Sequence, residues 1–325
     1  MGLKQLVKDF RATMLTGKIF WTDLYGREYL KQHWNGYIEN DTDYSEKYRA
    51  LVHGLDEKSI DTVVKILKRY KAIVSSDKKR MDIFTDDENI MLYRLKYDFH
   101  QAILRVAPDI WAWRDYLLPV SHFEGNVFFY NNGMGEIENS ELLKGKVFID
   151  VGAYVGDSAL VMRRYEPSKI YCFEPDPTNV RLMEKTFQIN QVNDSIPVNK
   201  ALGNSHSKVR MQGGGVGGYI DLSNKTGNTE VEMITLDEFV EEKAIEVGLI
   251  KVDIEGAERF FLEGAKRTIC SQKPVLLISI YHTIQDFFEL KPMIEEWNIG
   301  YRFKIYKPVI ENPIAETLLI AECTG

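Results

Sequence analysis

The spacing of apolar residues divides the chain into two parts at about residue 122. In residues 1–122 the apolar positions recur at helical intervals, first at residues 3–10 and more regularly at residues 55–73. Asp56 precedes the second of these segments and is expected to cap its helix. A further helix is expected over residues 86–106, ending before a proline because proline disfavours a helical residue in front of it. The pattern therefore predicts a helical N-terminal domain.

From residue 123 onward, short apolar runs alternate with amphipathic segments, as they do in α/β domains. We expect strands at residues 127–130, 147–150, 169–173, 196–201, 250–253, 275–281, 301–306 and 318–322. We expect helices at residues 158–164, 178–188, 236–242, 257–271 and 288–296. Apolar strands that alternate with helices predict a doubly wound, mostly parallel sheet within a domain over residues 123–325. The last two strands follow the last helix, so they predict an antiparallel edge.

One segment of the second domain departs from this alternation. Residues 208–211 and 229–234 alternate between polar and apolar positions like the strands of a hairpin, and the glycine-rich Gly213–Gly218 lies between them. No Gly-Lys-Ser/Thr sequence follows, which disfavours a nucleotide phosphate loop. We expect a flexible β-hairpin or loop, and the pattern leaves open whether it covers a binding site.

The composition of the 325 residues is that of a globular protein, with 44% apolar and 12% aromatic residues. A net charge of −7 disfavours a nucleic-acid partner, because proteins of that class carry basic surfaces. The three cysteines form no Cys-x-x-Cys pair and the N-terminus has no signal-peptide pattern, so we expect a cytoplasmic protein. No apolar run reaches the roughly 20 residues of a membrane-spanning helix.

The most informative segment is the turn that follows the strand expected at residues 147–150. The strand ends in Asp150, and Gly152 and Gly156 lie in the turn before the next helix. Because glycine lets a ligand approach the backbone closely, this arrangement predicts the binding of an adenosine-type cofactor. A carboxylate beneath the ligand favours a positive charge over a phosphate, as in the sulfonium of S-adenosylmethionine. The expected cofactor contacts of this segment are Asp150, Gly152, Ala153, Tyr154, Gly156, Asp157 and Ser158.

Further polar residues occur where the other strands are expected to end, and parallel strands bring these ends to one edge of the sheet. Glu174, followed by Pro175, would accept hydrogen bonds from ribose hydroxyls, and Ala201 would leave room beside an adenine ring. Asp253 and Glu255 would lie near the methyl-bearing end of the cofactor, which Asp253 would also contact. A carboxylate at that position can orient an acceptor hydroxyl or take its proton.

His282, at the end of the strand expected at residues 275–281, is a further candidate because the unperturbed pKa of histidine is near neutrality. We therefore predict Asp253, Glu255 and His282 as catalytic residues. The three could also form an oxygen and nitrogen site for a metal, but no spacing demands one and we predict none. Each predicted residue could instead be only a helix cap, a turn residue or a solvated side chain. For this to hold for all of them, several unrelated residues would have to meet at one sheet edge by coincidence.

Six motifs of the second domain make the chain similar to the FkbM family of S-adenosylmethionine-dependent methyltransferases. They are FIDVGAYVGDSA (148–159), FEPDPTN (173–179), ALGN (201–204), TLDEF (235–239), KVDIEGAE (251–258) and the strand end YH (281–282). The resemblance implies the Rossmann-like class I methyltransferase fold and O-methylation of an acceptor, often a sugar, a glycan precursor or a small natural product. Residues 1–122 fall outside the motifs and are expected to cover the pocket or to choose the acceptor.

Two other functions stay open at this point. An NAD-dependent oxidoreductase also has an acid after its second strand, but Tyr154 occupies the position of the second glycine in its Gly-x-Gly-x-x-Gly sequence. A non-catalytic binding or assembly module could retain the same fold, although the presence of Asp150, Glu174 and Asp253 argues against loss of the site. The sequence does not indicate the oligomeric state, and a homo-oligomer is compatible with it.

Overall fold

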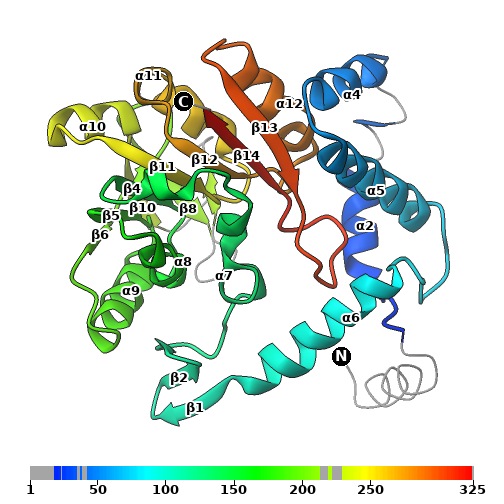
Figure 1. Ribbon diagram of the computed structural model, residues 1–325, viewed down its shortest axis with the longest axis horizontal. Coiled ribbons are helices and arrows are strands. Elements are labelled where there is room, and N and C mark those ends of the chain that lie inside the picture. Colours follow the sequence, from blue (N-terminus) through cyan, green and yellow to red (C-terminus); the bar gives the residue numbers. More distant parts are fainter. Residues whose placement is uncertain are drawn as a thin grey trace.

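The computed structural model describes residues 18–22, 24–34, 37–38, 42–212, 219–221 and 229–323 (Figure 1). A large sheet lies at the centre, and the N-terminal helices lie along one of its edges. The helix expected at residues 3–10 and the glycine-rich segment Gly213–Gly218 lie outside the described residues.

The central sheet has seven strands in the order β13-β14-β12-β11-β4-β5-β6. Their bounds are β4 Val147–Val151, β5 Lys169–Phe173, β6 Ser195–Val198, β11 Val247–Val252, β12 Val275–Ser279, β13 Tyr301–Tyr306 and β14 Leu318–Cys323. All pairs from β6 to β12 are parallel, whereas β14 is antiparallel to both β12 and β13. The prediction of a doubly wound, mostly parallel sheet with an antiparallel edge is confirmed.

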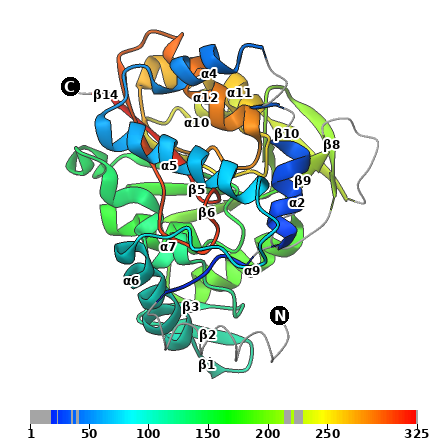
Figure 2. The ribbon, with the colours of Figure 1, turned by 90° about the vertical axis from the view of Figure 1, so that its right-hand side faces the viewer.

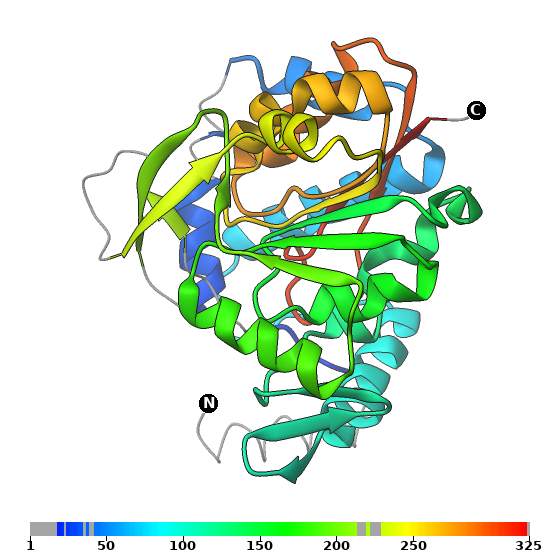
Figure 3. The ribbon, with the colours of Figure 1, turned by 90° about the vertical axis from the view of Figure 1, so that its left-hand side faces the viewer.

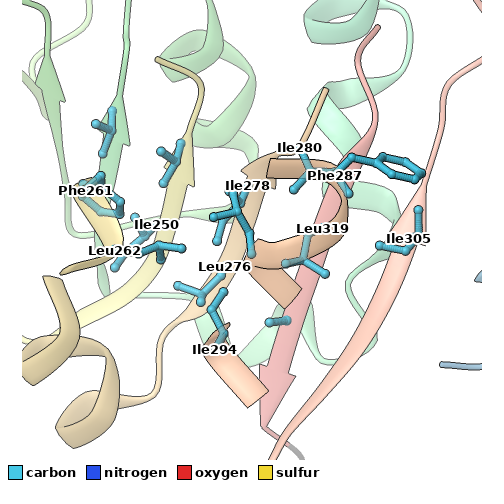
Figure 4. Packing of buried hydrophobic residues seen from close by; sticks show 14 of the residues in the cluster. Ile250, Phe261, Leu262, Leu276, Ile278, Ile280, Phe287, Ile294, Ile305 and Leu319 are labelled. Carbon is cyan, nitrogen blue, oxygen red and sulfur yellow. The ribbon is translucent and has the colours of Figure 1, made fainter. Parts of the chain in front are cut away.

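Helices cover both faces of this sheet, which is why its strands are apolar throughout. The helices that follow the strands are α8 Asp157–Met162, α9 Pro177–Ile189, α10 Leu236–Lys243, α11 Glu258–Gln272 and α12 Ile284–Glu295. Figure 3 shows α9 on one side of the sheet and α10 and α11 on the other. Successive strand residues alternate accordingly: Phe148 packs in the core beside α8 and α9, and Ile149 packs in the core beside α10, α11 and α12. Figure 4 shows the second of these cores.

The ends of these helices follow from local capping chemistry. Asp176 accepts a hydrogen bond from the Thr178 amide at the start of α9, and Thr235 forms a capping box with Glu238 at the start of α10. Thr283 accepts a hydrogen bond from the Asp286 amide, so α12 begins at Ile284, four residues before the expected start.

Two of the expected strands differ in the structure. Residues 127–130 do not form a strand, because Val127 and Phe128 end the short helix α7 Gly125–Phe128 and Phe129 caps it. A run of four apolar residues fits a buried helical turn as well as a strand. The strand expected at residues 196–201 is divided into β6 and β7 Ala201–Leu202, and β7 pairs with a different sheet. This second sheet has the order β7-β10-β8-β9, with β8 Ser207–Gln212, β9 Tyr219–Asp221 and β10 Thr229–Ile234. The hairpin expected from the alternation is confirmed by the antiparallel pairing of β8 and β10.

The N-terminal part is mostly helical. Its helices are α2 Leu24–His33, α4 Tyr44–Val52, α5 Glu57–Val74 and α6 Asp86–Arg94, the last continued by the π-helical η1 Leu95–Phe99 and the 3₁₀ turn η2 His100–Ala102. Asp56 caps α5 by accepting a hydrogen bond from the Ser59 amide at 2.7 Å, as expected. The helix expected up to residue 106 ends at Ala102, because the next residues enter a small antiparallel sheet. Its strands are β1 Leu104–Ala107, β2 Ile110–Trp113 and β3 Tyr116–Leu118.

Three 3₁₀ turns complete the described elements, η3 Asn131–Glu136, η4 Ser140–Leu143 and η5 Arg163–Tyr165. None of the helices in the described part of the chain is long and apolar enough to cross a membrane.

The N-terminal helices pack on the edge of the large sheet and on helix α12. Helix α5 lies along β13 (Figure 1), and α4 lies against α12 (Figure 2). The fully buried Trp34 places its ring 5.5 Å from the ring of Tyr70 in α5 and 5.5 Å from the ring of Phe287 in α12. The two parts of the chain therefore share one hydrophobic core, and the domain boundary near residue 122 stays a prediction.

Candidate active site

A cavity opens at the carboxyl ends of β4, β5 and β11, where open α/β sheets bind ligands. Most of the residues predicted from the sequence line this cavity, namely Gly152, Tyr154, Asp157, Ser158, Glu174, Pro175, Ala201, Asp253 and Glu255. Among the described residues predicted for the site, Asp150, Ala153, Gly156 and His282 do not line it.

The turn between β4 and α8 requires glycine at two positions. Gly152 has φ +77° and Gly156 has φ +80°, both in the left-handed region. A Cβ atom on Gly152 would lie 1.9 Å from the carbonyl oxygen of Asp253, so this turn touches the end of β11 directly. At Gly156, a Cβ atom would meet the side chains of Met183 and Phe187. The glycines thus bring the cofactor turn against the neighbouring strand and helix, and only Gly152 borders the cavity.

Glu174 is held in place at the end of β5 by three donors. Its carboxylate accepts hydrogen bonds from the Tyr154 amide at 3.0 Å, the Asp176 amide at 2.9 Å and the Asn179 side chain at 3.2 Å. Burial raises the pKa of Glu174 to about 7, even though these hydrogen bonds act in the opposite direction. The carboxylate therefore links the first and second strand ends and borders the cavity in a fixed orientation.

Asp150 has a different place from the one expected. Its side chain is fully buried beneath the turn, where Lys251 Nζ lies 3.2 Å from its Oδ1 atom and the Ser158 hydroxyl donates to its Oδ2 atom. Lys251 also donates a hydrogen bond to the Gly152 carbonyl oxygen at 2.8 Å. Asp150 thus supports the turn from below, where its charge is paired with that of Lys251. The expectation that Asp150 contacts the cofactor is wrong, because its side chain does not border the cavity. Ala153 is likewise fully buried.

Lys251 was not predicted as a site residue, although a lysine inside an apolar strand is a recognisable signal of a buried ion pair. Burial alone would lower the pKa of Lys251, but the carboxylates of Asp150, Asp253 and Asp157 raise it. The side chain is therefore a permanent cation at the floor of a cavity that is otherwise rich in acids.

Asp157, on the first turn of α8, is buried and borders the cavity. Burial, together with the nearby charge of Glu124, raises the pKa of Asp157 to about 7. Glu124 and His122 also line the cavity, from the loop before α7. No periodic pattern of the sequence marks this loop as part of the site. Its place opposite the strand ends follows from the fold alone.

The fourth and fifth strand ends meet around His282. His282 Nδ1 lies 2.9 Å from Glu258 Oε1, and His282 Nε2 lies 3.3 Å from Asp253 Oδ1 and 3.7 Å from Glu255 Oε2. Burial alone would lower the pKa of His282, but the three carboxylates, Glu258 foremost, raise it to about 10. An imidazole that already holds its proton at neutral pH is a poor proton acceptor. This geometry favours Asp253 and Glu255 over His282 for that role.

A second cavity borders the first. Glu255 and Tyr281 line both cavities, and His282 lines the second one. The N-terminal part contributes Trp21, Gly26, Tyr29, Leu30 and Trp34, and the segment before β14 contributes Asn312, Pro313, Ile314 and Ala315. The two parts of the chain therefore build this cavity jointly, which residue spacing did not reveal.

Comparisons with known proteins agree with this fold. A family described as the methyltransferase FkbM domain matches residues 150–303. The crystal structure of an FkbM methyltransferase from Methylobacillus flagellatus KT is similar with a TM-score of 0.58 and 17% identity, covering 89% of this chain and 60% of that protein. The chain thus spans 60% of the length of that protein.

Two solved methyltransferases with a bound cofactor are more distant. TYW2 from M. jannaschii, in complex with AdoMet, has a TM-score of 0.39 and 12% identity over 67% of this chain and 87% of its own. A putative methyltransferase from Streptococcus mutans, in complex with SAH, has a TM-score of 0.37 and 10% identity over 62% of this chain and 99% of its own. No match to the chain was found among curated proteins. Over residues 150–303 the chain is therefore similar to the methyltransferase domain of the FkbM family.

Proposed function

We propose that the protein transfers a methyl group from S-adenosylmethionine to a hydroxyl oxygen of a sugar, a glycan precursor or a small natural product. One observation carries this proposal: a single cavity joins the glycine turn and Glu174 on one side to Asp253 and Glu255 on the other. The first pair suits an adenosine cofactor, and the second suits an acceptor that must lose a proton.

The residues of the first cavity match the parts of S-adenosylmethionine. Glu174 would accept hydrogen bonds from the ribose hydroxyls, and Pro175 and Ala201 would border the adenine. Gly152 leaves room for the methionine part beside the turn. The excess of carboxylates around this end of the cavity complements the positive sulfonium and the amino group of the cofactor.

The reaction is a direct displacement. The acceptor oxygen attacks the methyl carbon, a carbon–oxygen bond forms while the carbon–sulfur bond breaks, and S-adenosylhomocysteine leaves. The sulfonium is an activated donor, so the protein contributes alignment and exclusion of water more than activation. Asp253 or Glu255 would take the hydroxyl proton, because both border the cavity and His282 is already charged.

The acceptor would reach the methyl group through the second cavity, which shares Glu255 and Tyr281 with the first. Aromatic side chains and carboxylates are suited to a sugar ring, which offers an apolar face and hydroxyl donors. On this proposal the N-terminal part of the chain helps to choose the acceptor.

Calorimetry with S-adenosylhomocysteine and with NAD tests the cofactor. We expect binding of S-adenosylhomocysteine and none of NAD, and the opposite result would favour an oxidoreductase. A mass-spectrometric assay with S-adenosylmethionine and candidate sugars then tests the reaction by the gain of one methyl group. Binding of neither cofactor would favour a non-catalytic module.

A further inference from the structure

Three side chains of the site converge on one point from different elements. Asp253 follows β11, Glu258 begins α11, and His282 follows β12. One oxygen or nitrogen atom from each lies within 4.8 Å of those of the other two. The parallel pairing of β11 with β12 produces this convergence, because it brings the two strand ends side by side.

Two of these side chains have a buried polar atom that makes no hydrogen bond within the described part of the chain. Glu258 Oε2 and His282 Nε2 are buried, and neither has a hydrogen-bond partner among the described residues. The side chain of Glu258 is 0% exposed and that of His282 is 6% exposed, so bulk water does not supply the missing hydrogen bonds. A buried polar atom without a hydrogen bond is unfavourable and uncommon in folded proteins, so two of them in one cluster indicate an absent ligand.

The charge around His282 indicates the kind of ligand. The carboxylates of Asp253, Glu255 and Glu258 lie within 3.7 Å of its ring nitrogens. Asp286 is buried on the first turn of α12 and interacts electrostatically with Glu258 and His282. Lys251 does not balance these acids alone, since it is paired with Asp150. The cluster therefore has an excess of negative charge in a buried place, which attracts a cation.

We propose that Asp253, Glu258 and His282 form a binding site for a divalent metal cation, with Glu255 beside its opening to the two cavities. Two carboxylates and one imidazole are a ligand set typical of Mn²⁺ or Zn²⁺. His282 would release the proton that it holds in the metal-free protein, because a histidine binds a metal through an unprotonated nitrogen. From the sequence, a metal on Asp253, Glu255 and His282 was considered but not predicted, because no spacing demands one. Glu258 was not among the predicted residues, since only the fold brings it beside His282.

The site would serve the reaction proposed above, on which this part of the inference rests. The ion would lie where the two cavities meet, and there it would hold an acceptor hydroxyl beside the methyl group. A divalent cation also lowers the pKa of a bound hydroxyl, so that the proton leaves more readily. A sugar or another acceptor with neighbouring hydroxyls could offer the ion two oxygen atoms.

Titration of Mn²⁺ into the chelator-treated full chain tests the site, with electron paramagnetic resonance to measure the free ion. We expect one Mn²⁺ per chain. Asp253→Asn and His282→Ala should each weaken binding by roughly tenfold or more, which is the scale of changes at a metal site. Glu124→Gln is the matched control, because it removes a carboxylate from the same cavity outside the three ligands, and it should change the affinity less than either ligand variant.

The outcomes separate this inference from the proposed function. Failure of the full chain to bind Mn²⁺ or Zn²⁺, or equal affinity in Asp253→Asn and the unaltered chain, would overturn the metal site. Circular dichroism checks that each variant is folded, and Asp253→Asn serves if His282→Ala is not. Calorimetry with S-adenosylhomocysteine on the same samples is the independent measurement. A chain that binds S-adenosylhomocysteine but not the metal ion would overturn only the metal site. A chain that binds the metal ion but not S-adenosylhomocysteine would overturn only the proposed methyl transfer.

Discussion

At the scale of single residues, the pair formed by Lys251 and Asp150 determines whether the cofactor turn keeps its shape. Both side chains are almost completely removed from solvent, at 8% and 0% exposure. Lys251→Met should lower the free energy of unfolding by about 3–5 kcal/mol, because it leaves the Asp150 charge buried without a partner. Urea denaturation followed by circular dichroism measures the change.

The double variant Lys251→Met with Asp150→Asn provides the control for this prediction. The neutral amide removes the unpaired charge and its oxygen can still accept the Ser158 hydroxyl, so part of the lost stability should return. Equal stability of the single variant and the unaltered chain would show that the pair is not what holds the turn.

Glu174 gives a prediction about pH. Its pKa in the free protein is raised from 4.5 to about 7 by burial, so a protonated fraction is present at neutral pH. Ribose hydroxyls donate best to the ionised form, and we therefore expect the affinity for S-adenosylhomocysteine to rise from pH 6 to pH 8. Calorimetry across this range measures the rise, and Glu174→Gln should bind more weakly with a flatter profile.

The same pKa shift affects the stability of the free protein in the opposite direction. A carboxyl whose pKa is raised on folding stabilises the fold fully below its unfolded value of 4.5, and this contribution is lost as the pH rises through about 7. The stability of the unaltered chain relative to Glu174→Gln should therefore fall between these pH values. A constant difference across the range would contradict the assignment to Glu174.

These residues show which parts of the site can be predicted from sequence. Gly152 and Glu174 follow strands that local hydrophobic runs reveal, so their place at the sheet edge follows from the fold class. The burial of Asp150 depends on Lys251 of a different strand, and the contact of Glu258 with His282 depends on the pairing of β11 with β12. Such pairs require tertiary register, which a single sequence does not show.

At the scale of elements, the same distinction applies. The strands and helices of the doubly wound sheet follow from long periodic patterns, whereas α7 and the divided β6 and β7 have too few residues for a pattern to decide. The helix that begins with α6 was expected to run to residue 106, but the helical segment ends with η2 at Ala102. The apolar residues that lead from η2 into β1 suit either structure.

Gly264 in α11 tests a contact between elements. A Cβ atom there would lie 1.9 Å from the Gly203 carbonyl oxygen, which follows β7. Helix propensity alone predicts that Gly264→Ala stabilises α11 by about 1 kcal/mol. The clash is with backbone, which cannot rotate away, so we expect a net loss of about 1–3 kcal/mol instead. Differential scanning calorimetry measures the change.

Gly135→Ala is the matched control, since no heavy atom lies within 4 Å of the added Cβ position. Its melting temperature should stay close to that of the unaltered chain. Because Gly203 adjoins the cavity residues Ala201 and Leu202, Gly264→Ala should also weaken the binding of S-adenosylhomocysteine. A Gly264→Ala variant that is more stable than the unaltered chain would mean that α11 can move away from β7.

At the scale of the whole molecule, the N-terminal part and the sheet depend on each other. The hydrophobic core that contains Ile250 and Phe261 of the sheet layers also contains Trp34 and Tyr70 of the N-terminal part. The same N-terminal part supplies one wall of the second cavity. A shared core implies that the shape of the cavity and the stability of the fold change together.

Trp34→Ala tests this dependence, because the ring is fully buried between Tyr70 and Phe287. Removing a buried aromatic ring costs about 3–5 kcal/mol, and we expect that loss to appear in a single cooperative transition of both parts. Denaturation followed by far-ultraviolet circular dichroism and by tryptophan fluorescence should give coincident curves. Ile90→Ala, at a side chain that is 60% exposed, should leave both curves nearly unchanged. Two separate transitions in the Trp34 variant would show instead that the N-terminal part folds on its own and only docks against the sheet.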